Sequence, residues 1–281
     1  MAMAMAIPLV CVSADMEESV AAAEEGIPGA DEAAVEVPPD LLEDEHFRGE
    51  MGINAMTTPS IRLIFDQLEE LGTVPFDEVW RAPQRPTAAD RVGVALRLGM
   101  LVADGFLLVQ EERYSEMEGL GKAILEHTDL LGTGTRLQRH SKALLEQAAL
   151  QNREGLRQQL VETQRDVERE MADLRDADIA HLISLGGWLR ALQIGGAAVA
   201  GNFSSESVRK LARVDITAYY QAQLTGLHPR LQERPVISGL RLGLARLQDL
   251  LDKPAGLDFT EDDLAAIRRQ ADLLLELIAA Q

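Results

Sequence analysis

Cysteine, aromatic residues and basic residues are all scarce in this sequence. Its 281 residues include a single cysteine, Cys11, which excludes a disulfide framework and any zinc site built from several cysteines of this chain. Aromatic residues make up 4%, too few for a β-sandwich with aromatic-rich strands. The 27 Lys and Arg residues face 46 Asp and Glu, a formal net charge of −19. Because a phosphate backbone needs cations to displace its counterions, we expect no nucleic-acid partner.

What remains is an ordinary globular composition. Hydrophobic residues make up 46% and charged residues 26% of the chain. The length fits one large domain or two small ones, since domains usually contain roughly 100–200 residues. The chain is therefore long and apolar enough to bury a sizeable core.

Residues 1–14 carry no charged side chain and resemble the remnant of a secretory signal peptide. Val12-Ser13-Ala14 places small or β-branched residues where a signal peptidase reads the chain, although the basic segment that usually precedes them is missing. The stretch is too short to span a membrane. We expect a periplasmic or secreted protein, with a cytoplasmic location as the alternative.

Residues 15–50 form an acidic stretch with thirteen acidic residues and one basic residue. Pro28, Pro38 and Pro39 interrupt every possible helix, and the apolar residues show no sustained period. Such a segment buries too little apolar surface to offset the entropy of ordering it. We therefore predict a disordered acidic leader with a solubilising role, or alternatively a binder of a basic partner or metal ions. Residues 51–281 are predicted to form a single helical domain.

From about residue 57 onward, apolar residues recur at steps of three and four, the period of amphipathic helices. Capping residues and glycines divide this pattern, and no alternating strand or internal repeat interrupts it. The longest segment could kink or break near Asp176. The predicted fold is an all-α, irregular multi-helix bundle with a long central helix. The expected helices are 58–72, 87–108, 114–131, 135–150, 153–200, 204–226, 236–251 and 260–281.

Gly93, Gly99 and Gly105 recur every six residues within one very apolar helix. A step of six turns the helix by roughly 240°, so the three glycines face different sides. We expect them to admit different neighbours closely, as a central helix requires. The other very apolar stretch, 182–201, contains Arg190 and several glycines, which favours a buried helix over a membrane span.

The familiar catalytic motifs are missing from the sequence. There is no G-x-x-x-x-G-K-[ST], no strand followed by G-x-G-x-x-G, no H-E-x-x-H and no G-x-S-x-G. Glu-x-x-His does not occur on a predicted helix, as a carboxylate-bridged di-iron bundle would need. We therefore expect no cofactor and no metal, and a binding protein more readily than an enzyme.

Asp178 and His181 are the best candidates for chemistry, because they lie one turn apart on the seam of the longest helix. A carboxylate at that spacing can accept a hydrogen bond from the imidazole and raise its pKa. The pair could then act as a general base or a metal ligand. A polar pair that fixes the register of a helix seam is the favoured interpretation.

Asp104 and Arg190 each stand among large apolar residues on the two most apolar helices. A buried carboxylate needs a donor, so we predict that the two form a buried ion pair that joins these helices. The alternative is a ligand pocket between the helices, lined by Asp104, Trp188 and Arg190.

Gly132-Thr133-Gly134-Thr135 precedes Arg136 and Arg139 at a predicted helix start. Free backbone N–H groups and arginines there could hold a phosphate or sulfate, with Thr135, Arg136 and Arg139 as the contacts. A glycine that ends one helix and a threonine that begins the next explain the sequence equally well.

These features favour a non-enzymatic helical binding or scaffold protein whose most expected partner is another protein, and the N-terminal residues favour export. One alternative is a metal-dependent or hydrolytic enzyme that uses Asp178 and His181 in a bundle cavity. The other is a small-ligand sensor built around Asp104, Trp188 and Arg190.

Overall fold

The computed structural model describes residues 73–86, 90–132, 134–173, 177–254 and 256–281. By its backbone contacts the chain divides into two units, 1–34 and 35–281, and every described residue belongs to the second. The predicted signal-peptide remnant, acidic leader and first helix all lie outside the described residues.

The part of the chain that the structure describes is helical and contains no β-strand, so the all-α prediction is confirmed. One 3-10 turn, η2 (Tyr114–Glu116), accompanies the α-helices. The helices are α3 (Phe76–Val79), α4 (Arg91–Gln110), α5 (Met117–Leu131), α6 (Gly134–Ala149), α7 (Arg153–Asp173), α8 (Ala177–Gly201), α9 (Ser205–Leu211), α10 (Val214–Gly226), α11 (Pro229–Gln232), α12 (Pro235–Leu251) and α13 (Glu261–Ala279).

Several helix ends lie where the capping residues of the sequence predict them. Gly132 ends α5 with a φ of 90°, a conformation that glycine adopts without strain. The Ser204 hydroxyl accepts a hydrogen bond from the Ser207 N–H at the start of α9. Thr260 and Asp263 form a reciprocal capping box at the start of α13.

Two predicted helices are divided in the structure. The segment 153–200 becomes α7 and α8, which end and begin on either side of residues 174–176. The segment 204–226 breaks at Ala212 and Arg213 into α9 and α10, which the sequence pattern did not predict. Arg213 precedes α10, and its guanidinium binds the Asp215 carboxylate in the first turn of α10, 2.6 Å away. An acidic residue in the first turn of a helix interacts favourably with the helix dipole, so Asp215 favours the start of α10 at this point.

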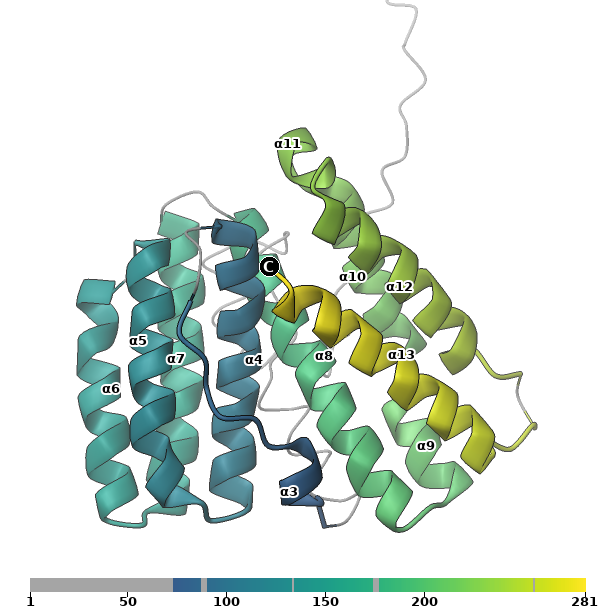
Figure 1. Cartoon of the computed structure of the whole chain (residues 1–281), viewed down its shortest axis with the longest axis horizontal. Helices are drawn as coiled ribbons and strands as arrows, with labels where there is room; N and C mark the ends of the chain where they lie inside the picture. Colours follow the sequence, from purple (N-terminus) through teal and green to yellow (C-terminus); the bar gives the residue numbers. More distant parts are fainter. Residues whose placement is uncertain (1–72, 87–89, 133, 174–176, 255) are drawn as a thin grey trace, which may run out of the picture. The chain divides into compact units, whose positions relative to one another are not determined.

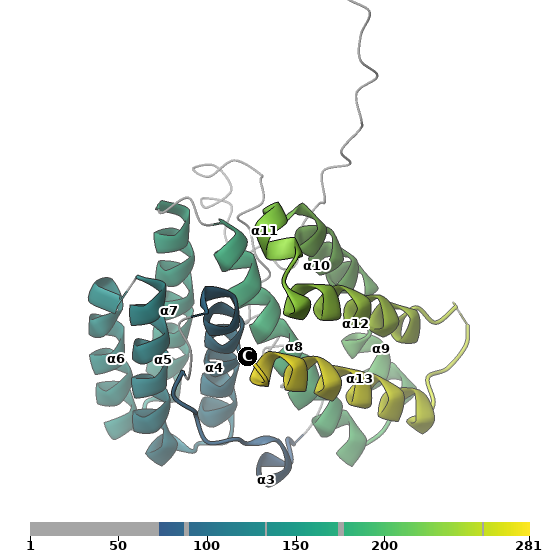
Figure 2. The same cartoon turned by 45° about the horizontal axis from the view of Figure 1, so that its top comes forward.

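Helices α4 and α8 pack against each other and form the centre of the described unit (Figure 1). Helices α5 and α7 pack on α4, and α6 packs on α5 and α7. On the other side, α13 packs on α8 and α12, and α12 packs on α10 (Figure 2). The C-terminus lies beside α4, which brings the end of the chain to the junction of the two groups of helices.

Glycines set the close approach of α4 and α8. A Cβ atom on Gly99 would lie 1.8 Å from the carbonyl oxygen of Ile183, and one on Gly186 would lie 1.9 Å from that of Leu96. Gly105 faces the side chain of Leu160 on α7 instead. The glycines of α4 therefore admit different neighbours, as the six-residue spacing predicts.

Helices α4 and α8 are long and apolar enough to cross a membrane by length and composition alone. Of the residues in the most apolar stretch of each helix, 89% in α4 and 94% in α8 are buried within the protein. Core helices pass the same test, so these two are weak evidence for a membrane span. The described helices share one hydrophobic core that extends from Val74 to Ile278.

Candidate ligand-binding cavity

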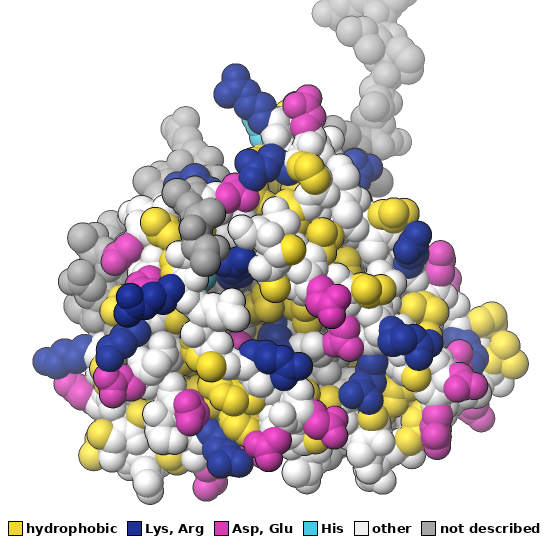
Figure 3. All heavy atoms as spheres, viewed as in Figure 1, with side chains coloured by type: hydrophobic (Ala, Val, Ile, Leu, Met, Phe, Trp, Pro, Cys, Tyr) yellow, Lys and Arg dark blue, Asp and Glu magenta, His cyan; other side chains and the backbone are white. Residues whose placement is uncertain are grey.

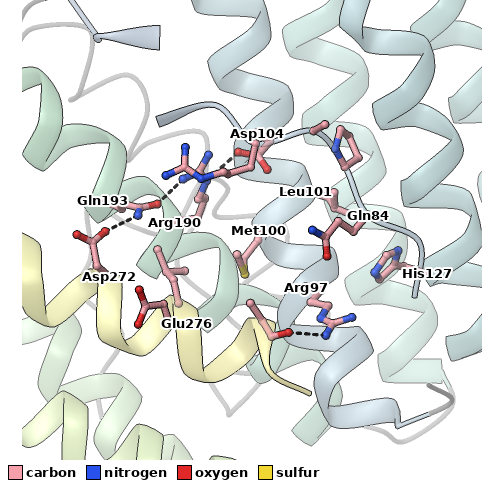
Figure 4. A pocket seen from close by; sticks show the side chains of 15 residues that line it. Gln84, Arg97, Met100, Leu101, Asp104, His127, Arg190, Gln193, Asp272 and Glu276 are labelled. Atoms are coloured by element: carbon pink, nitrogen blue, oxygen red, sulfur yellow. Dashed lines mark hydrogen bonds and ion pairs between the residues drawn. The ribbon is translucent and has the colours of Figure 1, made fainter. Parts of the chain in front are cut away.

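A cavity of ≈ 450 Å³ opens among α4, α8 and α13, between the connector that follows α3 and one side chain of α5 (Figure 4). Small-molecule sites in proteins commonly have volumes of roughly 300–1,000 Å³. Apolar and polar side chains both line this cavity. The apolar ones are Ala82, Pro83, Met100, Leu101, Leu275 and Ala279; the polar ones are Arg81, Gln84, Arg97, Asp104, His127, Arg190, Gln193, Asp272 and Glu276.

Asp104 of α4 and Arg190 of α8 form the predicted buried ion pair in the wall of this cavity. The guanidinium Nε donates to the Asp104 carboxylate at 2.8 Å, and the two residues are 6% and 3% exposed. Burial raises the pKa of the Asp104 carboxyl above its ordinary value, although the charge of Arg190 and its hydrogen bond oppose this shift. The prediction that the pair joins α4 to α8 is confirmed.

Further hydrogen bonds hold Arg190 in place and extend the pair to other elements. Its second guanidinium nitrogen donates to the Val79 carbonyl at 2.6 Å, at the end of α3. A third nitrogen donates to the Gln193 side chain, whose amide donates to the Asp272 carboxylate of α13 at 2.5 Å. This network connects α3, α4, α8 and α13, and it occupies the hydrogen-bonding groups of Arg190 along one wall of the cavity (Figure 4).

His127 of α5 contributes a buried and unpartnered acceptor. The residue is 1% exposed, and its Nδ1 lies 2.7 Å from the Ala123 carbonyl oxygen. A carbonyl can only accept, so Nδ1 carries the proton and Nε2 of the neutral ring is a bare acceptor. Burial lowers the pKa of His127; the bond to Ala123 opposes this shift and the charge of Arg97 adds to it. Nε2 has no hydrogen-bond partner in the described protein.

The sequence reasoning did not single out His127. The signal was present, because His127 falls at a helical step from Leu120, Ile124 and Leu131, all buried on α5. A polar ring at a core position of a helix is a reason to look for its partner. Here the partner of one nitrogen is local, and the other nitrogen has no described partner in a residue that lines the cavity.

The remaining charges of the cavity come from different elements. Arg97 of α4 donates to the Ala279 carbonyl at 3.0 Å, and Arg81 donates to the Glu78 and Trp80 carbonyls. Asp272 and Glu276 lie one turn apart on α13 (Figure 4). Among the described residues no ion pair involves these four charged groups, and the Gln193 amide on Asp272 is the one hydrogen bond that joins any of them to another side chain. The cavity therefore presents charges that the protein leaves available.

Trp188 does not line this cavity, and its part in a ligand pocket stays a prediction. Its ring packs against Tyr220 of α10, with ring centroids 5.3 Å apart. Trp188 and Arg190 are two positions apart on α8, and two positions on a helix point about 200° apart. Trp188 thus faces the α10 side while Arg190 faces α4.

Asp178 and His181 do not form the predicted pair. The Asp178 carboxylate accepts a hydrogen bond from the His228 backbone N–H at 2.9 Å, at the start of α11. His181 turns inward, with its Nδ1 3.5 Å from the Tyr219 hydroxyl and its Nε2 unpartnered. Burial lowers the pKa of His181 to about 4, the opposite of the expected shift. The enzymatic alternative loses the pair on which it rested.

The proposed anion site falls at the first turn of α6. Thr135, Arg136 and Arg139 lie within this helix, but their side chains are outside the described part of the structure. Binding of an anion there remains a prediction. An imidazole–carboxylate contact does occur nearby, where His140 Nε2 lies 2.8 Å from the Asp166 carboxylate of α7.

Metal binding and similarity to known proteins give no independent indication of function. No group of three or more His, Cys, Asp or Glu side chains that could hold a metal ion occurs among the described residues. Comparison of the chain with protein families, characterised proteins and solved structures finds no match.

Proposed function

We propose that this protein is a non-enzymatic binding protein that holds a small polar molecule in the cavity among α4, α5, α8 and α13. The observation that carries the proposal is the acceptor Nε2 of the buried His127. An unpaired buried acceptor costs roughly 1–3 kcal/mol, and among the described side chains that carry one, His127 is the one that lines the cavity, where a ligand would supply the donor.

The wall composition supports the same proposal. Apolar side chains such as Met100 and Leu101 would remove a ligand's carbon skeleton from water, while Arg97 and Glu276 would fix its orientation. The buried network around Asp104 and Arg190 keeps the cavity wall rigid, which lowers the entropy cost of binding.

A protein partner was the leading expectation from the sequence. Figure 3 shows acidic, basic and apolar side chains interspersed across one face of the molecule, with no large patch of a single kind. Large exposed apolar patches usually mark protein interfaces, so this face offers less for a protein than the cavity offers for a small molecule.

The test compares two neighbouring tryptophan substitutions. Ala279→Trp should fill the cavity, because Ala279 lines it, whereas Ala280→Trp adds the same ring one residue later at an exposed position that does not line it. Protein purified natively from its source should release one small molecule on denaturation, and so should Ala280→Trp. Ala279→Trp should release none.

Equal retention by both variants would contradict the proposal, as would a native protein that carries no small molecule and is not stabilised by any in a broad screen. A bound ligand raises the free energy of unfolding in proportion to the logarithm of its concentration above Kd, so thermal unfolding provides the screen.

A further inference from the structure

We infer that the ligand of this cavity is a zwitterion, a small molecule with one carboxylate and one protonated amine, such as an amino acid. This inference rests on the proposed function and names the chemistry of its ligand. It follows from the arrangement of the cavity's charges and from the one buried acceptor in its wall.

The cavity is polarised by element. The α4 side, where Arg97 lies near His127, carries a cation outside any ion pair with a described residue, whereas the charge of Arg81 on the connector acts on Asp104. The α13 side carries two carboxylates, Asp272 and Glu276, and in Figure 4 they lie away from Arg97 and His127. A ligand carboxylate fits the first side, because a guanidinium offers paired donors to it. A ligand ammonium fits the second side.

The ion pair in the wall leaves the balance of these charges unchanged. Asp104 and Arg190 neutralise each other, and the bonds to Val79 and Gln193 engage each of the two remaining guanidinium nitrogens. The lining therefore carries three arginines and three carboxylates, with a neutral His127. A ligand with a net charge would leave one of the two sides without a counter-charge in a partly desolvated site, which is unfavourable.

His127 selects for a donor on the ligand. Its Nε2 can only accept a hydrogen bond while Nδ1 donates to the Ala123 carbonyl. A simple carboxylate has no proton to donate, whereas an ammonium group has three N–H donors. An amine next to the ligand's carboxylate would therefore donate to His127, whereas an amine at the far end of the ligand would reach the carboxylates of α13.

Four small probes separate these contributions. Norleucine and 6-aminohexanoate are zwitterions of the same composition, with the amine next to the carboxylate or at the far end of the chain. Hexanoate is the same skeleton without the amine, and pentylamine is that skeleton without the carboxylate. Titration calorimetry with the full chain, after removal of any co-purified molecule, should show that one zwitterion binds at least tenfold more tightly than hexanoate and pentylamine.

Charge-removing variants locate the two ends of the ligand. Arg97→Gln should weaken zwitterion binding by about tenfold and leave pentylamine binding unchanged, since it removes a charge-assisted hydrogen bond to the ligand carboxylate only. Glu276→Gln should weaken the zwitterion and leave hexanoate unchanged. Arg241→Gln, at an exposed α12 position that does not line the cavity, is the matched control and should change neither.

The outcomes separate this inference from the proposed function. The zwitterion assignment would be overturned if hexanoate or pentylamine bound as tightly as both zwitterions. If that binding were also lost in Ala279→Trp, the cavity would still be a small-molecule site. Failure of all four probes, together with a native protein that releases no small molecule, would overturn both. If Arg97→Gln and Glu276→Gln both left zwitterion binding unchanged, the ligand would bind elsewhere, and the inference would also be overturned.

Discussion

Three buried polar side chains, Arg190, His181 and His127, are accommodated in this core in different ways. Arg190 has a carboxylate partner and two further acceptors. His181 is kept neutral by burial among helices α8 and α10. His127, which lines the cavity, bonds one nitrogen within its own helix and leaves the other without a described partner. Arg190 and His181 should each affect the free energy of unfolding, and His127 is the basis of the proposed binding role.

Removal of Arg190 should destabilise the fold strongly. In Arg190→Met the buried Asp104 carboxylate is left without its partner, a loss of about 3–5 kcal/mol in the free energy of unfolding. The double variant Asp104→Leu with Arg190→Met should recover much of that loss. Chemical denaturation of the two single variants and the double variant measures the coupling.

The exposed pair between Lys122 and Glu118 provides the control for this cycle. Lys122→Met breaks an ion pair that faces water and should change the unfolding free energy far less than Arg190→Met does. A cycle in which Asp104 and Arg190 show no coupling would contradict a stabilising buried pair.

His181 should make stability depend on pH. Its pKa is about 4 in the folded protein and near 6.5 when unfolded, so the unfolded state binds a proton first as the pH falls. The His181 contribution is fully present above about pH 6.5 and is lost as the pH falls towards 4, a decrease of about 3 kcal/mol. His181→Leu should flatten the unfolding free energy over this range.

The exposed His228 is the matched control. His228→Gln removes an exposed imidazole instead, and its unfolding free energy is measured over the same pH range. An unfolding free energy that falls equally from pH 6.5 to 4 in the original protein and in His181→Leu would show that His181 is not the group responsible.

At the scale of the helices, the contact of α4 with α8 depends on glycine. Gly99→Ala would place a methyl group 1.8 Å from the Ile183 carbonyl oxygen, and neither backbone can move without opening the core. We expect a loss of about 3 kcal/mol or more in the free energy of unfolding. Gly119→Ala, on the exposed side of α5 with nothing within 4 Å of the new methyl group, should instead stabilise by about 0.5–1 kcal/mol.

Thermal and chemical unfolding of the two variants would test this contrast. If both substitutions stabilise the protein to the same extent, α4 and α8 do not approach as closely as the structure places them.

Local signals made the helices largely predictable, and tertiary contacts explain what the sequence missed. Thr260, Ser204 and Gly132 mark helix ends through their own side chains or backbone, so the sequence is sufficient there. The break between α9 and α10 at Arg213 contains no proline or glycine, so the sequence pattern does not predict it. Asp178 was assigned to His181 from helical spacing, but a backbone N–H fifty residues away takes its carboxylate.

At the scale of the whole molecule, the candidate site was only partly predictable. The pair of Asp104 with Arg190 could be inferred because each charge interrupts an apolar face, and a buried charge needs a partner. The cavity beside it depends on where α13 and the C-terminus pack, since Ala279 accepts from Arg97 across 182 residues of sequence. No periodicity or motif encodes such a distant neighbour.

The binding role of the cavity also predicts that His127 is not retained for stability. His127→Phe gives up the hydrogen bond to Ala123 and removes a buried acceptor without a partner, and these two effects oppose each other. The unfolding free energy should change by less than about 1 kcal/mol, while binding of the zwitterionic probes should weaken. A variant that loses several kcal/mol of stability would indicate a structural role for the ring.

The most direct test of ligand binding in this cavity is nitrogen NMR of the His127 side chain in protein labelled at its histidines. In the protein without ligand at neutral pH, the account predicts a neutral ring with the proton on Nδ1 and a bare Nε2. Addition of norleucine or 6-aminohexanoate, or of the small molecules released from native protein, should shift the Nε2 signal in the direction of an accepted hydrogen bond. An Nε2 signal that no addition moves, or a proton on Nε2 from the outset, would contradict the account.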